Sequence, residues 1–202
     1  MAVGGGVRRA APWVVVLLLP GCMAKPVPRT HFYRLDASAT SHATMASPRL
    51  KGVLVIERFR ADGLTGDRPI LYSEGSALEL DQHHYHYWVE PPTDILQEQM
   101  AAYLRGRNVA TTVVTPELRI QPDYVVTGRI IRFERVLGDG REHVVVEARL
   151  TLMDVAAERL VWADTYRIEK PVEGRGVRAA VEAFNQGVGE MLARFADDIA
   201  RP

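Results

Sequence analysis

The residues that come closest to a metal-binding or catalytic group in this sequence are the four consecutive positions His-His-Tyr-His at 83–86. On an extended strand side chains alternate between faces, so His84 and His86 would share one face and His83 would take the other. Two imidazoles on one face could begin a zinc site, but a catalytic zinc takes three protein ligands. The remaining candidate, His143, has no positional argument in its favour. We therefore predict an aromatic, partly exposed strand and no metal site.

Sequence patterns typical of enzymes are missing elsewhere in the chain. There is no Gly-x-Ser-x-Gly motif, and the sole cysteine, Cys22, lies too early for a Cys-His pair. The glycines of Gly138-Asp139-Gly140 separate two β patterns and precede no helix, so they form no phosphate loop. Asp67, Glu90 and Asp94 lie near turns, where acidic residues usually act as caps. We expect no enzymatic activity and no cofactor.

The position of Cys22, directly after an apolar leader, indicates lipidation and not catalysis. Arg8 and Arg9 precede the apolar stretch 10–19, a combination typical of a secretory signal. That stretch is too short to span a bilayer, which takes about 20 residues. The segment Leu19-Pro20-Gly21-Cys22 resembles the lipobox of bacterial lipoproteins, although Pro20 departs from the usual small residue. The resemblance implies cleavage after Gly21 and a lipidated Cys22.

A lipidated Cys22 would fix the chain lastingly to a membrane, since two or more acyl chains hold a protein stably. Met23 follows, and by resemblance to enteric sorting rules this favours the periplasmic face of the outer membrane. The expected organisation is a signal peptide at 1–21, the lipidated cysteine and a tether at 22–30, and one domain at 31–202. The arginine pair could also belong to a twin-arginine export signal, which the neighbouring residues do not support.

Composition is that of an ordinary globular domain, with 47% hydrophobic and 25% charged residues. The formal net charge is zero, and loss of Arg8 and Arg9 with the leader would make it slightly negative. This excludes the basic footprint of a nucleic-acid-binding protein. The patterns predict strands at 31–35, 50–59, 70–72, 83–89, 109–114, 124–136, 143–153 and 160–168, and helices from about 93 to 106 and 177 to 199.

The clearest β pattern is the pair 124–136 and 143–153, which we expect to form a hairpin. Residues 144–153 alternate between an apolar and a mixed face, typical of an antiparallel sheet covered on one side. The C-terminal helix carries an apolar stripe at Val177, Val181, Phe184, Val188, Met191, Phe195 and Ile199. The stripe could be a coiled-coil seam, but we expect it to cover the sheet. We predict an α+β fold, a mainly antiparallel sheet with two amphipathic helices packed on one face.

Several local motifs together resemble the ABC-type transport auxiliary lipoprotein family. They are Phe32-Tyr33-Arg34-Leu35, Leu64 with Arg68-Pro69-Ile70, Tyr87-Trp88-Val89-Glu90-Pro91, Phe133-Glu134, and the terminal Ala-rich helix. The resemblance covers nearly the whole mature chain. It implies a non-catalytic envelope component that accompanies an ABC permease, an ATPase and a mammalian-cell-entry (MCE) domain protein in moving lipids or apolar compounds between membranes.

Three roles follow from the resemblance. A docking module would bind a protein partner at an edge strand or at the aromatic strand of Tyr85, Tyr87 and Trp88. A lipid-binding domain would instead hold an apolar cavity between sheet and helices. A structural lipoprotein that assists outer-membrane or secretion-complex assembly would use the same tether. The sequence does not separate these three.

Overall fold

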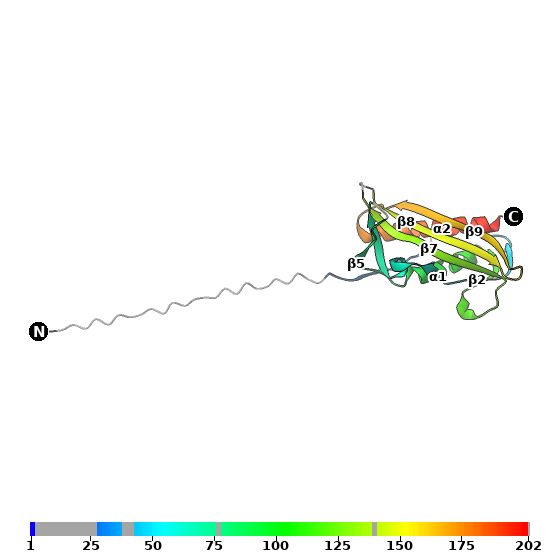
Figure 1. Cartoon of the computed structure of the whole chain (residues 1–202), viewed down its shortest axis with the longest axis horizontal. Coiled ribbons are helices and arrows are strands. Elements are labelled where there is room, and N and C mark those ends of the chain that lie inside the picture. Colours follow the sequence, from blue (N-terminus) through cyan, green and yellow to red (C-terminus); the bar gives the residue numbers. More distant parts are fainter. Residues whose placement is uncertain (3–27, 38–42, 76–77, 139–140, 202) are drawn as a thin grey trace.

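The computed structural model describes residues 1–2, 28–37, 43–75, 78–138 and 141–201. Their strands and helices run in the order β1 (His31–Tyr33), β2 (Leu50–Ile56), β3 (Arg60–Ala61), β4 (Pro69–Glu74), β5 (Asp81–Trp88), α1 (Pro92–Gly106), β6 (Ala110–Val114), β7 (Tyr124–Leu137), β8 (His143–Asp154), β9 (Arg159–Pro171) and α2 (Gly176–Ala200) (Figure 1). Short 3-10 turns, η2 (Gly63–Gly66) and η3 (Pro116–Leu118), join some of them. Among these residues no helix is both long and apolar enough to cross a membrane.

Strand β7 is the central strand of a single curled sheet. Along one edge it pairs antiparallel with β8, which pairs antiparallel with β9. Along its other edge it pairs in succession with β2, β3 and β4, and all three pairings are parallel. Strand β6 lies parallel to β2, while β5 lies antiparallel to β4 and β1 parallel to β5. The sheet therefore has two ends. Strands β2 and β6 lie beside the N-terminal part of β7, whereas β4, β5 and β1 lie beside its C-terminal part.

The prediction of a mainly antiparallel sheet is wrong, because the sheet is mixed. Strands β2 and β6 are joined by a long crossover that contains α1, and such a crossover can return a strand in the parallel direction. Alternation of apolar residues shows which face of a strand is covered. It does not show the direction of the neighbouring strand, which depends on connections across tens of residues.

The expected hairpin is confirmed. Val136 lies opposite His143, and the pairing continues to Tyr124 opposite Asp154, so the register matches the predicted alternation. The inward side chains of β8 are fully buried, namely Val144, Val146, Ala148, Leu150 and Leu152. Phe59 packs against Gly128 of β7, where the Cβ atom of any larger residue would lie only 2.6 Å from the ring. The glycine is therefore required for this close approach.

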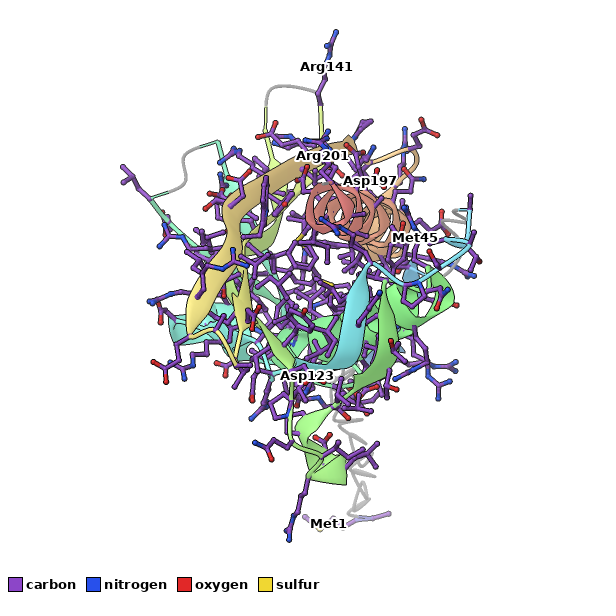
Figure 2. The ribbon with its side chains drawn as sticks, turned by 90° about the vertical axis from the view of Figure 1, so that its right-hand side faces the viewer. Met1, Met45, Asp123, Arg141, Asp197 and Arg201 are labelled. Atoms are coloured by element: carbon purple, nitrogen blue, oxygen red, sulfur yellow. The ribbon has the colours of Figure 1, made fainter. Side chains whose placement is uncertain are left out.

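Both helices contribute to one hydrophobic core on the concave side of the sheet. Helix α2 packs on β8 and β9, and α1 packs on β6 and β2. Seen end-on in Figure 2, the sheet curls around α2, whose C-terminal end is marked by the labels of Asp197 and of Arg201, the residue just after the helix. The apolar stripe of α2 is buried along its length, as the periodicity predicts. Helix α1 begins at Pro92, a first-turn position that suits proline because no backbone donor is lost there.

Candidate functional site

Strand β5 carries the aromatic and histidine residues, and its course is irregular. Pro69 of β4 lies opposite Tyr87 and Leu71 lies opposite Gln82, so the four residues 83–86 of β5 face the single residue Ile70. Strand β5 therefore bulges, which bends a strand and re-aims its side chains. Within the bulge Tyr85 has a φ of 65°, a left-handed conformation that costs a non-glycine residue roughly 1–2 kcal/mol.

The bulge changes which histidines meet. The rings of His83 and His86 lie 5.9 Å apart, edge to face, whereas His84 is exposed. The prediction that His84 and His86 share a face is therefore not borne out, because it assumed a regular strand. His86 Nδ1 shares a hydrogen bond of 2.9 Å with the Tyr33 hydroxyl, and its ring stacks on His31 at 5.1 Å. Strand β1 is thus tied to β5 by side chains as well as by its backbone.

His83 is held neutral inside this end of the domain. Its ring lies 4.6 Å from that of Tyr72, and its Nε2 is buried without a hydrogen-bond partner among the described residues. Burial, reinforced by the positive charge of Arg135, lowers the pKa of His83 to about 4. Arg135 is itself buried and pairs with Glu142. A cation next to the imidazole opposes metal binding, and the described residues contain no group of three metal-ligating side chains.

The outward face of β1 and β5 is apolar and exposed. Phe32 of β1 lies beside Tyr87 of β5, with their ring centroids 6.0 Å apart. Phe32 is 58% exposed, and Val89, just after β5, is 38% exposed. The Arg68 guanidinium lies 5.5 Å from the centre of the Phe32 ring, and its Nε donates a hydrogen bond to the Trp88 carbonyl. We call Phe32, Arg68, Tyr85, Tyr87 and Val89 the β1–β5 surface.

The three predicted partner-binding residues separate into two environments. Tyr85 is 40% exposed within the bulge of β5, and Tyr87 is half-buried beside Phe32. Trp88 is 1% exposed and lies in the core, 5.5 Å from the Phe133 ring and 5.4 Å from the Phe184 ring. It supports β5 from inside and cannot touch a partner at the surface without a rearrangement of the core.

Sequence reasoning did not single out Phe32 or Arg68 as surface residues. The segment His-Phe-Tyr at 31–33 indicates that Phe32 points to the opposite face from His31 and Tyr33, because side chains alternate along a strand. The pairing of β1 with β5 brings together segments more than 50 residues apart, and nothing local predicts it.

A groove lies next to the β1–β5 surface, between the end of β1 and the start of α1. Its volume is about 250 Å³, and its lining includes Arg34, Leu35, Val89, Glu90 and Ile95. Ligand sites for drug-sized molecules usually have roughly 300–1,000 Å³ and mainly apolar walls. This groove is small, open and partly charged, which does not suit a buried lipid chain.

Cys22 and Gly21 lie outside the described residues, so the lipidation and cleavage sites stay predictions. The described chain resumes at Pro28 and leads directly into β1. In Figure 1 the chain reaches the domain at the end of the sheet where β5 lies. The predicted tether therefore ends next to the β1–β5 surface.

Comparison with solved structures shows the same fold in other proteins. A crystal structure of a protein from Xanthomonas campestris is 19% identical, with a TM-score of 0.72 over 83% of this chain and 93% of the other. The crystal structure of another protein is 16% identical, with a TM-score of 0.67 over 85% of this chain and 99% of the other. At these identities the likeness establishes the fold alone.

Comparison with curated proteins gives no significant match. The sequence model of one family, described as the ABC-type transport auxiliary lipoprotein component, matches residues 33–200. That match runs from β1 to the last turn of α2 and so includes every residue of the β1–β5 surface except Phe32. The chain therefore belongs to the family of ABC-type transport auxiliary lipoprotein components.

Proposed function

We propose that the protein is a lipid-anchored, non-catalytic subunit of an ABC transport system of the MCE type, which moves lipids or apolar compounds across the bacterial envelope. The observation that carries this proposal is the family match over 33–200, on a domain that begins nine residues after a cysteine in a lipobox-like sequence. ATP hydrolysis belongs to a separate ATPase subunit. The protein contributes attachment and contact at the periplasmic face of the outer membrane.

Docking fits the structure better than carriage of a lipid inside the domain. The space between sheet and helices is filled by side chains that are fully buried, among them Leu54, Leu96 and Phe184. Close-packed interiors leave no room for an acyl chain without displacement of such residues. Exposed apolar side chains lie on the outside of the domain instead, both at the β1–β5 surface and at the opposite end of the sheet, where Leu118 and Leu160 are exposed. Of these two places the β1–β5 surface carries the aromatic residues, and we assign Tyr85 and Tyr87 a role in contact with a partner.

Purification of the native complex from envelope membranes tests the proposal. With a C-terminal affinity tag on this chain and a mild detergent, we expect an MCE-domain protein to co-purify, together with its permease and ATPase. Cys22→Ser is the matched control, because it should remove the acyl chains and reduce recovery of the complex without altering the fold.

Two results would contradict the proposal. Recovery of an outer-membrane assembly or secretion complex in place of the MCE protein would support a structural role. Stoichiometric lipid bound to the purified domain, with no protein partner, would support carriage of lipid. Mass spectrometry of the purified chain identifies the lipid and detects any acyl group on Cys22 in the same preparation.

A further inference from the structure

The β1–β5 surface is the most apolar feature at the end of the domain where the chain arrives from its predicted anchor. Phe32, Tyr87 and Val89 point outward from adjacent positions, while Tyr33 and Trp88 point into the domain. Exposure of 58% is high for a phenylalanine, whose side chain gains roughly 1.5–3 kcal/mol on full burial. Its exposure is therefore a free-energy cost that a contact at this surface would remove.

Strain accompanies this exposure. The three-residue excess of β5 over β4 places Tyr85 in a left-handed conformation, at 40% exposure, on the same strand as Tyr87. Strain of this kind persists only where the surrounding structure enforces it, and it clusters at sites of contact or chemistry. The buried imidazole of His83 and the hydrogen bond between Tyr33 and His86 hold the bulge in place.

One guanidinium group at the surface, that of Arg68, is placed to meet an anion. Arg68 lies over Phe32, and the exposed Arg29 and Arg34 precede and follow β1. Three exposed acids, Asp36, Asp67 and Glu90, flank the same residues, so the surface carries no net charge and its affinity for an anion depends on Arg68 itself. The mature chain as a whole is slightly negative. Aromatic rings beside guanidinium groups suit the headgroup layer of a bilayer, where the ring enters the acyl boundary and the cation meets phosphate.

Distance limits what this surface can reach. His31 is the ninth residue after Cys22, so β1 starts at most roughly 30 Å from a lipidated cysteine. The β1–β5 surface is the part of the domain nearest that anchor, whereas Leu118 and Leu160 lie at the opposite end of the sheet, beside the start of β7. A short tether also keeps the effective concentration of the surface at the membrane high, so a contact too weak to bind from solution is sufficient.

We infer that the β1–β5 surface rests on the phospholipid headgroup layer of the membrane to which the chain is anchored, with Phe32 and Tyr87 inserted at the interface and Arg68 on a lipid phosphate. This inference rests on the lipid anchor of the proposed function and names the partner of the surface. The domain is then held in one orientation, with the β2–β6 end of the sheet directed away from the membrane.

Fluorescence quenching in vesicles tests the orientation. The lipidated mature protein is reconstituted in phosphatidylethanolamine–phosphatidylglycerol vesicles that contain a nitroxide-headgroup lipid. A single fluorophore is attached at Glu90→Cys, next to the surface, or at Leu118→Cys, at the far end. Cys22 is the only cysteine of the chain. Since its sulfur is blocked by the lipid in the lipidated protein, the introduced thiol is the only free one. We expect quenching at position 90 to exceed that at 118 by about threefold or more.

Substitution of the exposed rings tests whether they cause the contact with lipid. Phe32→Ser with Tyr87→Ser should reduce quenching at position 90 to the level at 118, while flotation with the vesicles stays unchanged because the acyl chains remain. Phe32→Trp with Tyr87→Trp should preserve it. Leu160→Ser, which removes another exposed apolar side chain at the far end, is the matched control and should have no effect. Thermal unfolding checks that each variant remains folded.

Each other outcome overturns the inference in a recognisable way. Equal quenching at both positions, or quenching at 90 that survives loss of both rings, excludes the lipid contact but leaves the anchor intact. Quenching at 90 that disappears when the purified transport complex is added assigns the surface to a protein partner instead. Absence of an acyl chain on Cys22 would remove both the anchor and the inference, whereas a failed recovery of the MCE protein would leave the orientation result unaffected.

Discussion

The two ends of the sheet differ in regularity. The hairpin of β7 and β8, with α2 packed on it, is regular: its residues alternate, its register is nearly continuous and its apolar side chains are buried. The end formed by β1, β4 and β5 is irregular, with a bulge, a left-handed tyrosine, a neutral buried imidazole and an exposed phenylalanine. The regular region is built to stabilise the fold. The irregular region contains strained and exposed residues that lower stability, and it is where we expect contact with a partner.

Trp88 and Tyr87 give the sharpest test of that comparison, since they are neighbours on β5 with opposite environments. Trp88→Ala should lower the free energy of unfolding by about 3–5 kcal/mol, because it removes a fully buried ring from between Phe133 and Phe184. Tyr87→Ala should cost less than about 1 kcal/mol. Urea unfolding followed by circular dichroism measures both. Similar losses for the two variants would show that the β1–β5 surface is part of the stabilising core.

Gly128 tests the regular region by itself. Gly128→Ala would place a methyl carbon within 2.6 Å of the Phe59 ring, so the ring or the strand must shift. We expect a loss of about 1–3 kcal/mol, the usual range for overpacking of a well-packed core. Gly106→Ala, at the exposed end of α1 with open space around it, serves as the control and should change the stability little. An unchanged midpoint for Gly128→Ala would mean that the β7 core is looser than its burial indicates.

The sequence predicted the regular end well because its determinants are local. The alternation in β8 and the stripe on α2 follow from the positions of side chains a few residues apart, and both are confirmed. The parallel pairings of β7 with β2 and β4 were not predicted, since they depend on connections that carry no local pattern. The mixed sheet follows from these pairings.

The candidate site was predicted less completely. Tyr85 and Tyr87 were predicted because aromatic residues on a polar strand are conspicuous, and their role in contact stays a prediction. The bulge at 83–86 was not predicted, because the run has the pattern of a regular strand. Trp88 was grouped with them, although the structure places it in the core. Local alternation indicates only that Phe32 points away from its two neighbours. Its position beside Tyr87 and Arg68 depends on tertiary pairing, which no local pattern predicts.

Substitution of Tyr85 should change the free energy of unfolding by a smaller amount and in the opposite direction. Tyr85→Gly should raise the free energy of unfolding by up to about 1 kcal/mol, because glycine adopts a φ of 65° without the steric cost that tyrosine incurs. The same substitution removes an exposed ring from the β1–β5 surface. Tyr85→Ala keeps the strained conformation without the ring and should not stabilise the domain. A destabilised Tyr85→Gly variant would show that the tyrosine ring makes a net stabilising contact in the bulge.

The smallest effect concerns pH. The pKa of His83 is about 4 in the folded chain, below the ordinary value of 6.5, so between these values the unfolded chain binds more protons. Stability from this group is therefore complete above about pH 6.5 and declines as the pH falls toward 4. His83→Gln should lose less stability than the parent between pH 7 and pH 5, by on the order of 1 kcal/mol after allowance for partial exposure. The control is His84→Gln, at the exposed neighbouring position, which should follow the parent. Melting temperatures at the two pH values measure the difference, and identical pH dependence in all three proteins would show that His83 is not held neutral by burial and by Arg135.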